Sequence, residues 1–233
     1  MNPRHRDRAV FVRIVSGIFE RDMQVVDQRS GKRVRLANAQ KLFGQDRETL
    51  DTAYAGDILA LVGNYNFLIG DTLTSDPNVV YEEMPRFTPE CFTYILNSDS
   101  ANIKRYRSGM EQLMKEGVAQ AYHVYGTAQR VPLLGAVGPL QFEVLQARLA
   151  SEYQTETRLE QSPWTVVQWL QENEPDHSRS DLHPPKVQLP SGCAIARDQD
   201  RQWVVLLPAK YLVKSLHDRN EHLTFRGGAE RDR

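Results

Sequence analysis

The chain has 233 residues, of which 40% are hydrophobic and 25% are charged, and these values are ordinary for a globular protein. Its formal net charge is -1, from 29 basic and 30 acidic residues, so overall charge gives no sign of a nucleic-acid partner, DNA included, or of a membrane partner. No apolar run reaches the roughly 20 residues that a membrane span needs, and the N-terminus lacks the apolar core of a signal peptide. We therefore expect a cytoplasmic protein with one large or two ordinary domains.

Residues 1–80 are predicted to form short strands. "AVFVRIVSG" (Ala9 to Gly17) is rich in β-branched residues. "MQVVDQRSGKRVRLANA" is predicted to form two short strands joined at Ser30-Gly31, which indicates a hairpin. Short strands separated by regularly spaced turn signals are typical of a small antiparallel β-barrel. Residues 81–89 carry Pro85 and Pro89, and their apolar residues follow neither the helical nor the strand periodicity. They are therefore predicted to be a linker.

Residues 90–233 are predicted to form an α+β domain. In residues 90–160 the order strand, helix, two strands, helix, strand is the split βαβ of ferredoxin-like domains. Residues 161–227 would be a C-terminal α/β extension, opening with a helix in "SPWTVVQWLQ" because Ser162 suits an N-cap and Pro163 a first helical position. The predicted fold class is thus a β-barrel domain followed by an α+β domain.

The helix in "GPLQFEVLQARLASEY" has two apolar stripes, Leu140, Val144 and Ala147 on one side and Phe142, Leu145 and Leu149 on the other. A surface helix has one such stripe, so two stripes predict burial on both sides. The ferredoxin-like sheet covers one side only. We expect the other side to pack against residues 161–227 or against a segment that this chain lacks.

The glycines Gly135 and Gly138 precede this helix, where many proteins bind phosphate. A dinucleotide fingerprint needs a third glycine at the position of Gln141, and Pro139 removes one of the helix-start amides. The sequence Gly-x-x-x-x-Gly-Lys-Ser/Thr of a phosphate loop is absent from the 233 residues. We therefore expect no bound cofactor and no GTP hydrolysis in this chain.

The same segment resembles a known family. "GAVGPLQFEVLQARLASEY" is similar to a segment of the release factor three family, translational GTPases that assist termination. "PRHRDRAVFVRIVSGIFERDM" resembles the opening of the second domain of that family, and "PRFTPECF" resembles the entry to its third domain. "AYAGDILALVGNYNFLIGDTL" resembles a signature that all translation-factor barrels share, including that of elongation factor G.

The resemblance implies a ribosome-binding C-terminal part of a release factor, which promotes recycling of the class one factors that read stop codons. Its implied partners are small-subunit ribosomal RNA and protein and the class one release factors. GTP and magnesium would belong to the GTPase domain of the full-length family, which this sequence does not contain. The resemblance therefore implies a binding role without catalytic residues or metal ligands.

Two groups of basic residues are candidates for contact with ribosomal RNA. Guanidinium groups bind phosphate in a bidentate manner, and Arg33 and Arg35 share one face of a strand by alternation. The predicted RNA-binding residues are Arg4, Arg6, Arg8, Arg33 and Arg35. No aromatic residue lies between them, so base stacking is not indicated there.

Three glycine-containing motifs are assigned to turns. Glycine permits unusual backbone angles and Asp bonds to nearby backbone, so the two Gly-Asp motifs are predicted to be structural. The turn residues are Gly56, Asp57, Gly70, Asp71, Gly135 and Gly138, and the last two are expected to face either the GTPase domain or the protein interior.

Two other functions stay open. One is a fragment of an elongation factor G-like or ribosome-protection GTPase, which normally continues into further domains. The other is a stand-alone adaptor whose barrel binds protein. An adaptor would bind with little salt dependence, whereas an RNA-binding factor would lose affinity steeply as salt rises.

Overall fold

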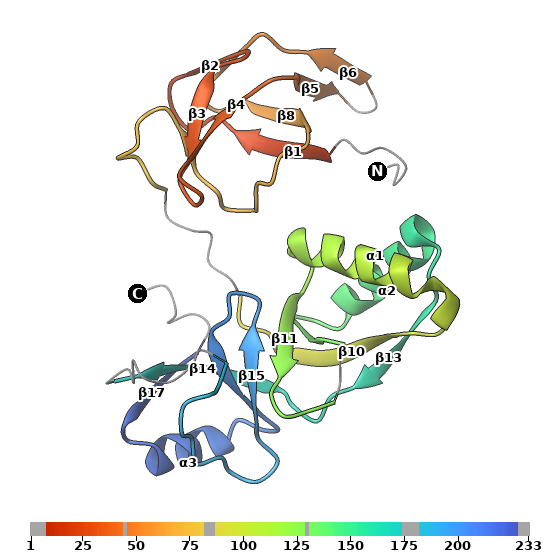
Figure 1. Ribbon diagram of the computed structural model, residues 1–233, viewed down its shortest axis with the longest axis vertical. Coiled ribbons are helices and arrows are strands. Elements are labelled where there is room, and N and C mark those ends of the chain that lie inside the picture. Colours follow the sequence, from red (N-terminus) through yellow and green to blue (C-terminus); the bar gives the residue numbers. More distant parts are fainter. Residues whose placement is uncertain (1–7, 44–45, 82–86, 129–130, 174–181, 228–233) are drawn as a thin grey trace. The chain divides into compact units, whose positions relative to one another are not determined.

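A computed structural model describes residues 8–43, 46–81, 87–128, 131–173 and 182–227. The chain divides into two compact units, Met1–Met84 (unit 1) and Pro85–Arg233 (unit 2), drawn in Figure 1. Within the described residues, no helix is both long and apolar enough to cross a membrane.

Unit 1 consists of short antiparallel strands. They are β1 (Arg8–Arg13), β2 (Ile18–Glu20), β3 (Gln24–Asp27), β4 (Lys32–Arg35), β5 (Ala39–Phe43), β6 (Asp46–Thr49), β7 (Thr52–Tyr54), β8 (Ile58–Gly63) and β9 (Leu73–Thr74). They form a four-stranded sheet in the order β1-β8-β5-β6, a three-stranded sheet β4-β3-β9 and a two-stranded sheet β2-β7. In the described residues these ladders do not close into one ring.

Alternating side chains of these strands build one core. Phe19, Val25, Leu59 and Leu61 are buried in a single cluster that draws on all three sheets. In β8 the buried run Leu59 to Leu61 follows the exposed Ile58, because β8 lies between β1 and β5 and is covered along most of its length.

Unit 2 is built on one eight-stranded antiparallel sheet in the order β13-β10-β12-β11-β15-β16-β14-β17. Its elements are β10 (Cys91–Asn97), the 3-10 helix η1 (Ser100–Asn102), α1 (Ile103–Lys115), β11 (Gln120–Val124), β12 (Leu133–Ala136), α2 (Leu140–Tyr153), β13 (Thr157–Gln161), β14 (Val166–Glu172), β15 (Ala194–Asp198), β16 (Trp203–Leu207), α3 (Leu212–Arg219) and β17 (Leu223–Arg226). The pairing of β11 with β15 joins residues 87–161 to the C-terminal strands in a single sheet.

The helices cover parts of one face of this sheet. Helices α1 and α2 pack on β10, β12 and β11 through a cluster that includes Ile95, Leu113 and Leu145. Helix α3 packs through Leu216 on Val205 of β16. Trp203 lies two residues before Val205 in β16 and therefore on the same face of the sheet. Figure 1 shows the α1–α2 pair and α3 at opposite ends of the sheet, with β11 and β15 between them.

The opposite face of the sheet carries its own apolar cluster. Phe92, Tyr122, Val204 and Trp169 belong to it and come from β10, β11, β16 and β14. No described helix contributes to this cluster, yet its members are at most 7% exposed. Trp164, which lies just before β14, packs against this cluster from outside the strands.

The helix predicted at Ser162 is wrong, because this segment contains strand β14. Ser162 Oγ accepts a hydrogen bond from the amide of Trp164, 3.1 Å away, which makes a local turn rather than a helix cap. Val167 and Trp169 then alternate toward the core, and β14 pairs with β16 on one side and β17 on the other. Pairing with two strands distant in sequence outweighs the local start signal.

The prediction that residues 161–227 cover the second side of α2 is also wrong, whereas its cover by a segment that this chain lacks stays a prediction. Phe142, Leu145 and Leu149 are buried, but Leu140 is 68% and Val144 50% exposed. The C-terminal strands extend the sheet sideways from β11, away from α2, so they cannot cover its second stripe.

We expect substitutions on the two stripes of α2 to differ sharply in their effect on the free energy of unfolding. Leu145→Ala should lower the free energy of unfolding by about 2–5 kcal/mol, because a fully buried leucine leaves a cavity. Val144→Ala should change it by about 0.5 kcal/mol or less. Urea denaturation of both variants checks this, and equal losses would contradict the exposed position of the Val144 stripe.

Candidate functional site

The basic strand β4 lies at one edge of the three-stranded sheet of unit 1. Its register pairs Val26 with Arg33 and Gln24 with Arg35, so both arginines lie on the same face. Both are exposed, while Val34 between them packs against the core. This edge therefore presents two guanidinium groups two residues apart to solvent.

The two arginines differ in their partners. Arg35 binds Asp22, with Nε 3.1 Å from Oδ1 and Nη2 3.1 Å from Oδ2, in a pair whose side chains are 65% and 42% exposed. Arg33 has no acidic partner among the described residues. An anion could bind Arg33 directly, whereas it would compete with Asp22 for Arg35.

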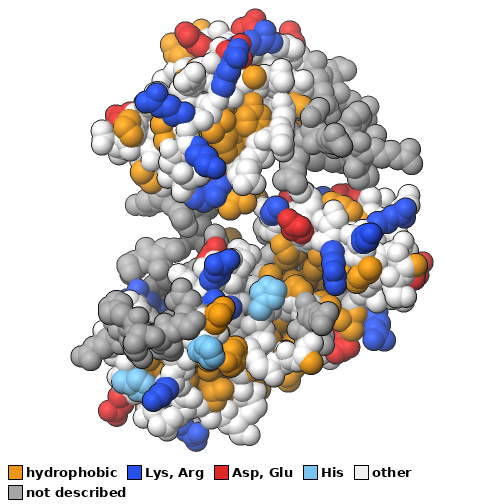
Figure 2. All heavy atoms as spheres, in the orientation of Figure 1, with side chains coloured by type: hydrophobic (Ala, Val, Ile, Leu, Met, Phe, Trp, Pro, Cys, Tyr) orange, Lys and Arg blue, Asp and Glu red, His pale blue; other side chains and the backbone are white. Residues whose placement is uncertain are grey.

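The structure does not bring the other predicted arginines into this strand. Arg8 begins β1 and pairs with Gly63, in a different sheet. Arg4 and Arg6 lie outside the described residues. In the view of Figure 2, the Lys and Arg side chains of unit 1 are spread over several places, so β4 is a local basic feature.

The two Gly-Asp motifs of unit 1 form the same turn. In each, the Asp carboxylate accepts a hydrogen bond from the amide three residues earlier: Tyr54 to Asp57, 2.9 Å, and Leu68 to Asp71, 2.7 Å. The Asp amide donates back to the carbonyl of that same residue, 3.0 and 3.2 Å away. Gly56 and Gly70 have φ of 100° and 95°, a region that side chains with a Cβ rarely adopt.

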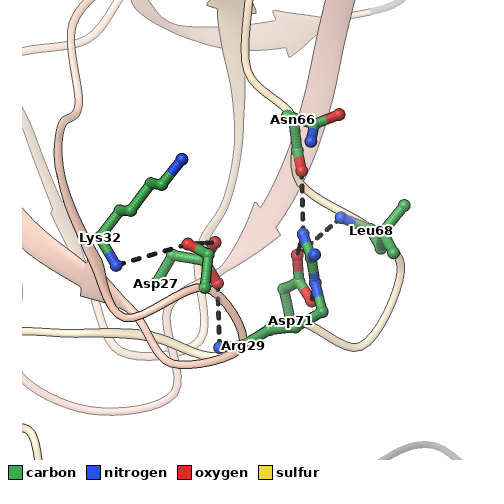
Figure 3. A network of polar contacts seen from close by, with 7 residues as sticks. Asp27, Arg29, Lys32, Asn66, Leu68 and Asp71 are labelled. Atoms are coloured by element: carbon green, nitrogen blue, oxygen red, sulfur yellow. Dashed lines mark hydrogen bonds and ion pairs between the residues drawn. The ribbon is translucent and has the colours of Figure 1, made fainter.

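Asp71 has a second partner that the sequence does not reveal. Arg29 donates to it from Nε and Nη2 over 2.7 and 2.9 Å, and Nη2 also donates to the Asn66 carbonyl over 3.0 Å (Figure 3). The Asp71 side chain is only 7% exposed. Arg29 lies in the turn between β3 and β4, so this pair fixes the hairpin that carries Arg33 and Arg35.

The Gly135–Gly138 segment has no open amides for phosphate. The side-chain oxygen Oε1 of Gln141 accepts hydrogen bonds from the amides of Val137 and Gly138, 2.9 and 3.2 Å away. Gln141 Nε2 donates to the Val118 carbonyl, 3.1 Å away, which fixes this orientation. Gly135 lies inside β12, where an added Cβ would come within 2.9 Å of Pro89 and Tyr122. The segment is a packed turn.

Other ionised groups of unit 2 are used in structure. Arg148 on α2 binds Glu116 at the end of α1 and Glu152 one turn further along α2. Its hydrogen bond lowers the pKa of Glu152, so this contribution to stability is present above the ordinary Glu pKa and is lost as pH falls through the lowered value. In the part of the chain that the structure describes, no three His, Cys, Asp or Glu residues are placed to hold a metal.

Two family profiles match the chain. The one described as "Class II release factor RF3, C-terminal domain" matches residues 81–217, and the one described as "Elongation factor G domain 2" matches residues 1–76. Curated proteins similar to the chain include several described as peptide chain release factor 3. That of Gloeobacter violaceus is 40% identical over 226 residues, which cover 97% of this chain and 41% of the relative.

Two further relatives show the same partial coverage. The protein of a Cyanothece species is 47% identical over 175 residues, 75% of this chain and 32% of the relative. That of Synechococcus elongatus is 47% identical over 171 residues, 73% of this chain and 31% of the relative. The chain thus spans about a third to two fifths of the length of these relatives.

We expect two ion pairs of unit 1, Arg29–Asp71 and Arg35–Asp22, to contribute unequally to stability. Arg29→Ala should cost about 1–3 kcal/mol of unfolding free energy, because it leaves the mostly buried Asp71 carboxylate without its cation. Arg35→Ala should cost less than about 1 kcal/mol, since its pair with Asp22 is exposed. Chemical denaturation measures the loss of unfolding free energy in both variants. A loss for Arg35→Ala as large as that for Arg29→Ala would refute the role given to Arg29.

The two glycines of the Gly135–Gly138 segment should also respond differently to alanine. Gly135→Ala is expected to destabilise unit 2 by about 1–3 kcal/mol, because the surrounding rings and Pro89 leave no room for a methyl group. Gly138→Ala meets no atom within 4 Å and should be close to neutral. Thermal unfolding distinguishes them, and a neutral Gly135→Ala would mean that the packing there is loose.

Proposed function

The chain belongs to the class II release factor 3 family, and from this premise we propose that it acts in translation termination as the ribosome-binding C-terminal part of such a factor. The match of residues 81–217 to the C-terminal domain of that factor carries the proposal. On this proposal it helps to recycle the class one release factors that read stop codons, and it works in the cytoplasm.

Within this proposal, each unit has a fold assignment. The three sheets of unit 1 would together represent the barrel of the second translation-factor domain, in keeping with the match of residues 1–76. The order β10-α1-β11-β12-α2-β13 with sheet order β13-β10-β12-β11 fits a ferredoxin-like core in residues 90–160. Residues 161–227 would extend it, and residues 81–89 would link the units.

The residues of this chain do not fit the GTP and magnesium of the full-length family. The helix-start amides of Val137 and Gly138 are already bonded to Gln141, and the described residues offer no cluster of metal ligands. The sequence also contains no phosphate loop. The two matched domains are not the GTPase domain, so we assign this chain a binding role and derive no catalytic step from it.

The basic strand β4 is the proposed RNA contact of unit 1. Arg33 and Arg35 share an exposed face, and Arg29 with Asp71 holds the hairpin in place. Guanidinium groups arranged along an edge strand suit the phosphates of small-subunit ribosomal RNA, while the turns at Gly56 and Gly70 serve only to shape the unit.

The alternatives are less well supported. A fragment of elongation factor G would account for the match of residues 1–76, but not for that of residues 81–217 to a release-factor domain. A protein-binding adaptor remains distinguishable by experiment, because neutral protein contacts do not release counterions from RNA.

We expect the purified chain to bind bacterial small ribosomal subunits with an affinity that falls as salt rises. Arg33→Ala with Arg35→Ala should weaken binding and reduce the slope of log affinity against log salt by about 1 to 2, because each lost phosphate contact removes about one unit. Sedimentation with ribosomal subunits at several salt concentrations measures this slope.

A matched control removes the same charge elsewhere. Lys115→Ala with Lys214→Ala also deletes two exposed cations, from α1 and α3 of unit 2, and should leave the slope unchanged. A chain that binds ribosomes with no salt slope would favour the adaptor. Equal reductions of affinity and of the salt slope in both double variants would contradict a specific role for β4.

A further inference from the structure

On the sheet face of unit 2 that carries helices α1, α2 and α3, the middle of the sheet is not covered by a described helix. Ala121 of β11 belongs to the cluster under α1 and α2, and Val205 of β16 belongs to the cluster under α3. His123 and Trp203 lie two residues from these positions and therefore on the same face. In Figure 1 neither helix layer crosses β11 or β15.

Four side chains define this surface, which we call the aromatic platform: His123, Tyr125, Arg197 and Trp203. The register pairs His123 with Arg197 and Arg197 with Trp203, so these three form a row across β11, β15 and β16. The Arg197 guanidinium lies 4.2 Å from the centre of the Trp203 ring. Tyr125 meets the same indole edge-on, with ring centres 5.8 Å apart and an interplanar angle of 83°.

The platform is accessible. Tyr125 is 47% exposed, His123 is exposed, and Arg197 and Trp203 are half-buried.

Within β11, β15 and β16, no carboxylate lies on the face of the platform. Asp198 is the single carboxylate in β11, β15 and β16, and it points to the opposite face, where it accepts a hydrogen bond from Trp169 Nε1 over 2.9 Å. The Nε atom of Arg197 is buried and has no hydrogen-bond partner among the described residues. An arginine that only filled space on the sheet would be expected to satisfy this donor with a nearby acceptor.

We propose that the aromatic platform binds single-stranded or looped RNA. The exposed Tyr125 ring and the outer side of the Arg197 guanidinium offer flat surfaces on which bases stack, and the N–H groups of Arg197 donate to phosphate or base oxygens. Aromatic rings beside an arginine whose Nε has no hydrogen-bond partner among the described residues fit RNA better than a protein strand. The inference rests on the proposed function for the source of the RNA, which would be ribosomal.

The direct test measures binding of a fluorescein-labelled 12-nucleotide oligouridylate to the full chain by anisotropy. Tyr125→Leu should weaken binding roughly tenfold, because stacking of one base on an aromatic ring contributes on that scale, and Tyr125→Phe should restore most of it. Arg197→Ala should also weaken binding and reduce its salt slope by about 1.

Two controls separate the platform from general effects. Tyr211→Leu removes an aromatic side chain that is 79% exposed elsewhere on unit 2, and it should leave binding unchanged. Poly-glutamate of equal charge should bind weakly and be insensitive to Tyr125→Leu. Equal losses for Tyr125→Leu and Tyr211→Leu, or tight poly-glutamate binding that depends on Tyr125, would overturn the proposal.

The outcomes also distinguish this inference from the proposed function. Binding to ribosomal subunits with normal salt dependence, together with oligouridylate binding that ignores Tyr125 and Arg197, would refute the platform alone. Loss of oligouridylate binding in Tyr125→Leu, in a chain that fails to bind ribosomal subunits at any salt concentration, would support the platform and refute the ribosomal function.

Discussion

The ladder between β11 and β15 is the constraint on which unit 2 depends. It pairs Tyr122 with Asp198 and continues in a hydrogen bond from the Tyr125 amide to the Ile195 carbonyl, 2.8 Å long. This ladder makes one sheet of two sets of strands, because it pairs β11 (Gln120–Val124) with the distant β15 (Ala194–Asp198). The separation of the two helix layers, the exposure of the second α2 stripe and the aromatic platform all follow from it.

Unit 1 is held together differently. Its strands are short and belong to three sheets, so loops carry much of the connection between them. Arg29 connects the β3–β4 turn to the loop around Asp71. The Tyr65 hydroxyl accepts a hydrogen bond from the Ala37 amide and donates one to the Ala37 carbonyl. A surface of basic side chains on β4 can keep a fixed shape because these loop contacts support it.

Much of the local structure could be predicted from the sequence. The predicted order of strand, helix, two strands, helix and strand in residues 90–160 is found from β10 to β13, and Ser30-Gly31 marked the turn between β3 and β4. In both cases the signal is contained in neighbouring residues, since helix periodicity and turn chemistry are local properties.

What could not be predicted depends on partners far away in the chain. Strand β14 begins with local helix signals and becomes a strand because β16 and β17 pair with it. The two stripes of α2 look equivalent until the position of the C-terminal strands is known. Arg29 meets Asp71 across 42 residues, and Tyr125 meets Trp203 only through the β11–β15 ladder, so no sequence pattern joins them.

Hydrogen exchange on the intact chain tests most directly whether unit 2 is one continuous sheet. If it is, the amides of residues 194–198 and 203–207 should open with those of residues 120–124 and 133–136, at free energies within about 1 kcal/mol of each other. Rapid exchange of the C-terminal strands while residues 90–160 stay protected would contradict this account. It would mean that the two halves fold independently and that the surface between the helix layers has no fixed shape.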